Sequence, residues 1–119
     1  MLVVEDVPSL QKLLVTMLRK AGHVVTAAGN GQEAVDLAAR QPFDIVLMDI
    51  QMPEMDGLEA TRIVKGASET KDIPLIARTA LAMKGDEERI RAAGCDGYVA
   101  KPIRYKEFLA IVAAQLAAV

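Results

Sequence analysis

Short runs of mostly apolar residues recur five times along the chain, and they are rich in Val, Ile, Leu and Ala. Such runs are typical of β-strands that a parallel sheet buries on both faces. The predicted strands are residues 1–4, 24–27, 43–48, 73–77 and 97–100.

The segments between these runs space their apolar residues three or four positions apart, as helices with one buried face do. The clearest case lies between Pro8, which suits a first helical turn, and Gly22, which suits a helix end. Its apolar stripe consists of Leu10, Leu13, Leu14, Met17 and Leu18. Similar spacing predicts further helices around residues 34–38, 58–65, 86–93 and 105–116.

Strands that alternate with helices predict parallel pairing, because right-handed crossovers place the helices on both faces of one sheet. We therefore predict the α/β class, as a (βα)5 flavodoxin-like three-layer sandwich with strand order 2-1-3-4-5. The length of 119 residues suits one domain over 1–119.

Composition narrows the function classes. With a net charge of -2 the chain lacks the excess of basic residues that binds phosphate backbones. Its 3% aromatic residues are too few for a surface on which bases stack, so direct nucleic-acid binding is not expected. The single cysteine, Cys95, excludes an internal disulfide. No apolar stretch reaches the length of a membrane span, and residues 1–5 do not form a secretory signal, so we expect a cytoplasmic location.

Charged and polar residues follow the predicted strands where each one ends. Glu5 and Asp6 follow the first strand, Asp49 follows the third, and Thr79 and Lys101 follow the fourth and fifth. The carboxyl ends of parallel strands meet at one edge, so these side chains should converge. Three clustered carboxylates resist full ionisation, and a hard cation such as Mg²⁺ relieves this. A cation and a lysine beside a carboxylate suit phosphoryl transfer to that carboxylate.

Four stretches carry a specific resemblance: LVVED at 2–6, IVLMDIQMPEMDG at 45–57, IARTA at 76–80 and GYVAKP at 97–102. Over nearly its whole length the chain resembles the receiver (CheY-like) domain of two-component response regulators. Within this family, the sequence resembles stand-alone DivK-like receivers or the receivers of hybrid histidine kinases.

The resemblance implies a phosphorelay switch rather than an enzyme with its own substrate. Asp49 would accept a phosphoryl group from the phosphohistidine of a histidine kinase or a histidine phosphotransfer protein. Mg²⁺ would be held by Asp6, Asp49 and the backbone carbonyl of Gln51, with Glu5 acting mainly through a metal-bound water. Autodephosphorylation would reverse the reaction.

The resemblance also implies how the phosphoryl group is held. Lys101 would pair with its oxygens, helped by the Thr79 hydroxyl and by the backbone of Ile50 and Ala80. Tyr98 would turn inward as Thr79 moves. The fourth helix, fifth strand and fifth helix would then present a changed surface to a downstream protein partner. A cis peptide bond is expected before Pro102, and no output domain is recognisable in the chain.

Three positions, Arg78, Gln51 and Leu81, bear on whether this chain switches and loses its phosphoryl group as the family does. Arg78 stands where the family usually has an apolar residue, so it must reach solvent, pair with a carboxylate or line a partner surface. We expect it to alter the switch or to add charge beside the phosphoryl site. Gln51 and Leu81 flank the route of attacking water, and Leu81 cannot orient a water molecule. We therefore expect an aspartyl phosphate that lasts minutes or more.

Two other functions share parts of this pattern. An aspartate-based phosphatase of the haloacid dehalogenase type would want a second aspartate at position 51, which is Gln51, and room for a cap. A flavodoxin-like cofactor binder would want a phosphate loop after the first strand, where Glu5 and Asp6 would repel phosphate. No G-x-G-x-x-G motif follows any predicted strand, so the sequence does not support dinucleotide binding.

Several residues have plainer interpretations. Asn30-Gly31 and Asp56-Gly57 are typical of turns. We expect His23 at the surface and Cys95 packed as a small apolar residue. Tyr98 could serve as a packing residue as well as a switch.

Overall fold

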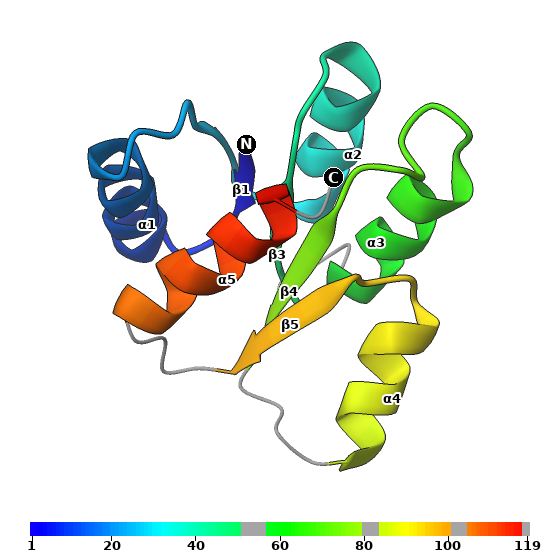
Figure 1. Cartoon of the computed structure of the whole chain (residues 1–119). Helices are drawn as coiled ribbons and strands as arrows, with labels where there is room; N and C mark the ends of the chain where they lie inside the picture. The colour runs from blue at the N-terminus through cyan, green and yellow to red at the C-terminus, as the bar shows by residue number, and fades with distance from the viewer. Residues whose placement is uncertain (51–56, 80–83, 101–104, 118–119) are drawn as a thin grey trace.

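The computed structural model describes residues 1–50, 57–79, 84–100 and 105–117. Strands and helices alternate along this part of the chain (Figure 1). The strands are β1 (Leu2–Val4), β2 (Thr26–Ala28), β3 (Val46–Asp49), β4 (Leu75–Thr79) and β5 (Gly97–Ala100). The helices are α1 (Pro8–Lys20), α2 (Gly31–Arg40), α3 (Gly57–Gly66), α4 (Lys84–Ala92) and α5 (Tyr105–Ala117).

All five strands pair in parallel, in the order β2-β1-β3-β4-β5. This confirms the predicted (βα)5 sandwich. The order places β1 beside the central strand β3, so the chain reverses direction across the sheet between them. In open parallel sheets, this switch point is where a functional site forms beyond the carboxyl ends of the strands.

The second, third and fourth strands begin two or three residues later than predicted. The reason is the pairing between strands: β1 begins at Leu2 and aligns that residue with Thr26 of β2 and Val46 of β3. Val46 in turn aligns with Leu75, the first residue of β4. Residues before these positions lie outside the paired register, although the Ile45 carbonyl still accepts a hydrogen bond from the Leu2 N–H at 2.9 Å. Ile45 is fully buried just before the register begins, so its apolar character reflects its packing in the core.

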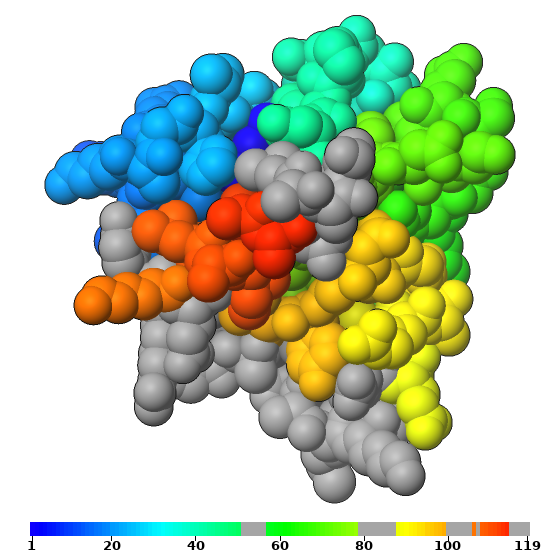
Figure 2. Space-filling view, viewed as in Figure 1, coloured from blue at the N-terminus to red at the C-terminus, as the bar shows by residue number. Residues whose placement is uncertain are grey.

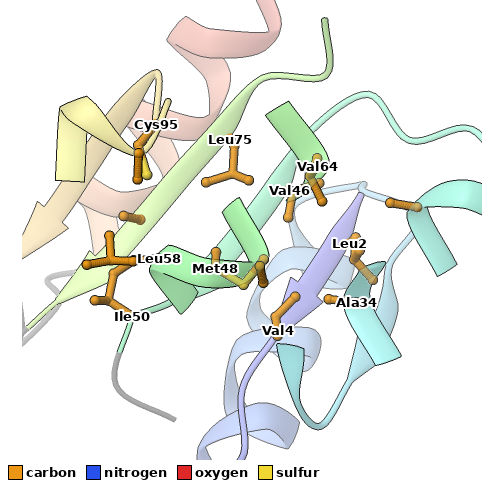
Figure 3. Close-up of a cluster of buried hydrophobic side chains, with 14 of the residues drawn as sticks. Leu2, Val4, Ala34, Val46, Met48, Ile50, Leu58, Val64, Leu75 and Cys95 are labelled. Carbon is orange, nitrogen blue, oxygen red and sulfur yellow. The ribbon is translucent and has the colours of Figure 1, made fainter. Parts of the chain in front are cut away.

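One face of the sheet packs against α2, α3 and α4 (Figure 3). Alternate strand residues point to this face, since successive side chains of a strand alternate sides. The strand residues of this core are Leu2, Val4, Ala28, Val46, Met48, Leu75 and Ala77. Ala34 of α2, Val64 of α3 and Ile90 of α4 meet them. The same helices therefore hold β1, β3 and β4 from one side.

The opposite face packs against α1 and α5. The surfaces of these two helices lie next to each other in Figure 2. Its strand residues are Val3, Leu47, Ile76 and Val99, and its helical residues include Leu18 of α1 and Phe108 of α5. By the same alternation, residues two positions beyond Val3, Leu47 and Ile76 belong to this face. Those residues are Glu5, Asp49 and Arg78.

Local signals explain where α1 and α2 begin and end. Pro8 occupies the first turn of α1, and Gly22 follows the helix with φ +96°, a conformation that glycine adopts without strain. Of the turn predicted at Asn30-Gly31 before the second helix, Asn30 does precede α2 and caps it. The Asn30 side chain accepts a hydrogen bond from the Glu33 backbone N–H at 2.8 Å, and Gly31 lies within the helix. Among the described residues, no helix has the length and apolar character needed to cross a bilayer.

Candidate functional site

The carboxyl edge of β1 and β3 brings three carboxylates together. Glu5 directly follows β1, and Asp49 ends β3; pairing of Val4 with Met48 sets the two side by side. Together with Asp6, each presents one carboxylate oxygen that lies within 4.8 Å of the corresponding oxygens of the other two. The structure thus brings Asp49 together with the adjacent pair Glu5 and Asp6, far away along the chain, as predicted from the strand ends.

These carboxylates differ in their access to solvent. Glu5 and Asp49 are each only 1% exposed, whereas Asp6 is partly exposed. The Glu5 backbone N–H donates to the Ala28 carbonyl at 3.0 Å, which ties the residue after β1 to β2. The Gln11 side chain donates to the carbonyls of both Glu5 and Ala28, at 3.1 and 3.0 Å. The backbone beneath the cluster is therefore held from two neighbouring elements.

Arg78 completes the cluster from β4. It lies opposite Asp49 in the strand register and is 1% exposed. Its Nη1 donates to Glu5 Oε2 at 3.1 Å, and its Nε has no hydrogen-bond partner in the described part of the chain. Of the three environments open to a strand arginine here, the structure shows a buried pair with a carboxylate. Burial of a guanidinium is costly unless a charge partner compensates, and Glu5 supplies that charge.

Burial and the neighbouring carboxylate of Asp49 raise the pKa of Glu5 to about 7, far above the ordinary value of 4.5. Burial is the largest cause, followed by the hydrogen bond to Asp49 and by its negative charge. The nearby Arg78 acts in the opposite direction but does not cancel these effects. The cluster therefore favours any positive charge that reaches it, whether a proton, a guanidinium or a metal ion.

The donor set suits a hard divalent cation. Three carboxylates offer only oxygen ligands, and Mg²⁺ is bound in proteins by one or two carboxylates together with waters. Asp6 is partly exposed, so solvent reaches the cluster from its side. The Gln51 carbonyl, also predicted as a ligand, lies outside the described residues, as do Ala80, Leu81, Lys101 and the peptide bond before Pro102.

The backbone beside Asp49 is engaged in two hydrogen bonds. The Ile50 N–H donates to the Arg78 carbonyl at 3.0 Å, and its predicted contact with a phosphoryl group stays a prediction. The Ile50 carbonyl accepts from the Gly57 N–H at 3.2 Å. A phosphoryl contact from the Ile50 N–H would require its bond to Arg78 to open.

Gly57 allows α3 to pack directly against the backbone of Asp49, a role that was not predicted from the sequence. The turn predicted there is wrong for Gly57, which begins α3, while Asp56 lies outside the described residues. A Cβ atom on Gly57 would lie 2.6 Å from the Ile50 Cα and 2.8 Å from the Asp49 carbonyl carbon, and closer still to the Asp49 carbonyl oxygen. Only a residue without a side chain lets α3 approach the backbone of Asp49 this closely.

The residues predicted to form the switch are only partly described. The backbone of Thr79 ends β4 and pairs with Ala100 of β5. Tyr98 is half-buried against the core under α2, α3 and α4, and the Arg91 guanidinium carbon lies 5.8 Å from the centre of its ring. This distance allows a cation–π contact between α4 and β5. The predicted movement of Tyr98 stays a prediction.

Cys95 and His23 lie away from the acidic cluster. Cys95 is buried in the core, its Sγ is 3.9 Å from the Thr61 Oγ1, and burial raises the pKa of its thiol. This confirms the expectation of a packed residue. His23 is half-buried in the turn after α1, where its backbone N–H donates to the Leu18 carbonyl.

Comparison with known proteins identifies the family. The family model described as the response regulator receiver domain matches residues 1–113. The polar-differentiation response regulator DivK of Brucella anthropi is 44% identical over 115 residues, which cover 97% of this chain and 94% of that protein.

Solved structures agree with this match. The receiver domain of a sensor histidine kinase from Pseudomonas aeruginosa, which holds a magnesium ion in its active site cleft, is 39% identical, with a TM-score of 0.90 over 98% of this chain and 95% of that one. The signal receiver domain of a histidine kinase from Syntrophus aciditrophicus is 32% identical, with a TM-score of 0.92 over 99% and 89%. With sequence, fold and acidic cluster in agreement, the chain belongs to the receiver domain family of two-component response regulators.

Proposed function

We propose that this receiver domain accepts a phosphoryl group on Asp49 in a Mg²⁺-dependent reaction and passes the signal on by a changed protein surface. The observation that carries the proposal is the cluster of Glu5, Asp6 and Asp49, with carboxylate oxygens within 4.8 Å of one another. The related receiver from Pseudomonas aeruginosa holds magnesium in its cleft, which supports the choice of ion.

Asp49 is the group that reacts. One of its carboxylate oxygens attacks the phosphorus of a phosphohistidine on a histidine kinase or phosphotransfer protein. The P–N bond breaks, its electron pair goes to the imidazole nitrogen, and an acyl phosphate forms on Asp49. In hydrolysis, water attacks the phosphorus, the bond to the Asp49 oxygen breaks, and inorganic phosphate leaves with the carboxylate restored.

The neighbouring side chains prepare this step. Asp6 and Asp49 would hold Mg²⁺ directly, and Glu5 would act through a metal-bound water. When bound, the ion screens the repulsion between the carboxylates and the incoming phosphoryl group and stabilises the charge that develops during transfer. Burial of Asp49 at the sheet edge restricts the orientations that its carboxylate can adopt. Lys101, from the segment after β5, would pair with the transferred oxygens.

The signal would leave through α4, β5 and α5. In this proposal the Thr79 hydroxyl moves toward the phosphoryl group, Tyr98 turns inward, and a downstream protein partner reads the new surface. A new local charge that biases two packing arrangements is sufficient for such a switch. We further propose that the aspartyl phosphate lasts minutes or more, because Leu81 offers no polar group to orient water.

Phosphorylation with acetyl phosphate tests the proposal directly. The wild-type protein should gain the mass of one phosphoryl group in the presence of Mg²⁺ and none in EDTA, as measured on the intact protein. Asp49→Ala should abolish the gain, and Asp72→Ala, which removes an exposed aspartate before β4, should leave it unchanged. A phosphoryl adduct that persists in Asp49→Ala would refute Asp49 as the acceptor.

A further inference from the structure

Arg78 is unusual both in where it lies and in how it is satisfied. It is the largest of the fully buried side chains in the described part of the chain. Its Nη1 reaches Glu5, while its Nε finds no partner among the described residues. An apolar residue at this point of β4 would extend the core of Ile76 and Leu47 without leaving a buried donor unpaired. The benefit of an arginine here must therefore come from the carboxylates.

The charges at the sheet edge indicate what that benefit is. Three carboxylates would place three negative charges within 4.8 Å of one another, and the guanidinium of Arg78 places one positive charge against them. It approaches from β4, inside the protein, whereas Asp6 borders the solvent. The cluster is thus neutralised in part from within, before any ion arrives from outside.

We propose that Arg78 is a positioning residue that serves as a resident counter-ion: it holds Glu5 in the metal-free protein and lowers the affinity of the cluster for divalent cations. This inference rests on the proposed function, in which the same carboxylates hold Mg²⁺. Two mechanisms produce the effect. The guanidinium repels a second cation across a poorly solvated gap, and it occupies a Glu5 oxygen that would otherwise face a metal-bound water.

A merely structural role for Arg78 predicts the opposite sign. If the arginine only kept the carboxylates in place, its removal would disorder them and weaken metal binding. If it competes with the metal, neutral variants must bind Mg²⁺ more tightly than wild type. The lysine variant must stay near wild type, because it keeps the charge. The direction of the change therefore separates the two roles.

Calorimetric titration with Mg²⁺ alone provides the measurement. The variants are Arg78→Leu, Arg78→Gln and Arg78→Lys, with Arg62→Leu as a control that removes an exposed arginine from α3 and causes the same change in net charge. The buffer pH should lie at least one unit above the pKa of Glu5, so that protons do not compete with the ion. Thermal unfolding with and without Mg²⁺ gives a second readout, since tighter binding raises the unfolding temperature further.

We expect Arg78→Leu and Arg78→Gln to lower the Kd for Mg²⁺ about tenfold, which corresponds to about 1.4 kcal/mol. Arg78→Lys and Arg62→Leu should stay close to wild type. An unchanged or higher Kd in folded Arg78→Leu would overturn the inference. If both neutral variants fail to fold, NMR of wild type decides: Mg²⁺ must move the Arg78 Nε–H resonance, and an unmoved resonance overturns the inference.

The same samples separate this inference from the proposed function. If wild type is phosphorylated on Asp49 but Arg78→Leu does not lower the Kd for Mg²⁺, only the role of Arg78 is overturned. Wild type that binds no Mg²⁺ and gains no phosphoryl group would overturn the proposed function and the role of Arg78 together.

Discussion

Replacing Gly57 by alanine tests how closely α3 is packed against the backbone that carries Asp49. The added Cβ would lie 2.6 Å from the Ile50 Cα and 2.8 Å from the Asp49 carbonyl carbon. Both neighbours are backbone atoms at the end of a central strand, so neither can swing aside as a flexible side chain would. Either α3 must move outward or the end of β3 must shift.

The expected cost follows from these contacts. Overpacking of this kind costs about 1–3 kcal/mol, and the backbone contact places Gly57→Ala at the upper end. Loss of the hydrogen bond from the Gly57 N–H to the Ile50 carbonyl adds about 1 kcal/mol. The better helix propensity of alanine returns about 1 kcal/mol. We therefore expect a net loss of about 3 kcal/mol in the free energy of unfolding.

Gly66, at the other end of the same helix, is the matched control. A Cβ there would meet nothing within 4 Å, so Gly66→Ala should be neutral or should stabilise the protein by up to about 1 kcal/mol. Urea denaturation of both variants in metal-free buffer measures the difference. Phosphorylation by acetyl phosphate should also slow in Gly57→Ala, because Asp49 moves with its backbone. A Gly57→Ala protein as stable as Gly66→Ala would refute this account of the packing.

Three further predictions concern single side chains. Because the pKa of Glu5 is about 7 in the folded protein against an ordinary 4.5, its contribution to stability is full below about pH 4.5 and is lost as the pH rises through 7. Glu5→Gln should remove this pH dependence, which amounts to at most about 3 kcal/mol in the free energy of unfolding. Urea denaturation of the metal-free proteins at several pH values measures it. The same pH dependence in wild type and Glu5→Gln would contradict the assignment. Asn30→Ala should cost about 1 kcal/mol by loss of the helix cap, with Asn30→Asp as the conservative control. Asp96→Ala should cost about 2 kcal/mol, because its carboxylate accepts from the Leu75 N–H at 2.8 Å and pairs with Lys65 at 2.7 Å, and Asp96→Asn should recover the backbone bond in part.

The strand order could be predicted because it depends on regularities that every such chain obeys. Apolar runs that alternate with helical stripes leave only parallel pairing with right-handed crossovers. Strand limits could not be predicted in the same way. The apolar character of Ile45 signals burial, and only the register with Leu2 shows that pairing begins one residue later, at Val46.

The environments of Gly57 and Arg78 illustrate why part of the site was not predictable. A glycine after an aspartate has the local signature of a turn, and nothing nearby in sequence reveals that the Asp49 backbone lies against it. Arg78 had three possible environments, and its partner Glu5 is 73 residues away along the chain. Such contacts depend on distances of a few ångströms between elements, which residue patterns do not encode.

The sequence by itself determined the fold class, the family resemblance and the convergence of Glu5, Asp6 and Asp49, because strand ends in a parallel sheet must share an edge. Only the tertiary structure decided how the charges of that edge are balanced. It places the Arg78 guanidinium against Glu5, 3.1 Å from its carboxylate, and buries both in the same core. The physical reason is that the pKa of a carboxylate and its affinity for a cation depend on desolvation and on charges within a few ångströms. Those quantities exist only once the strands are assembled.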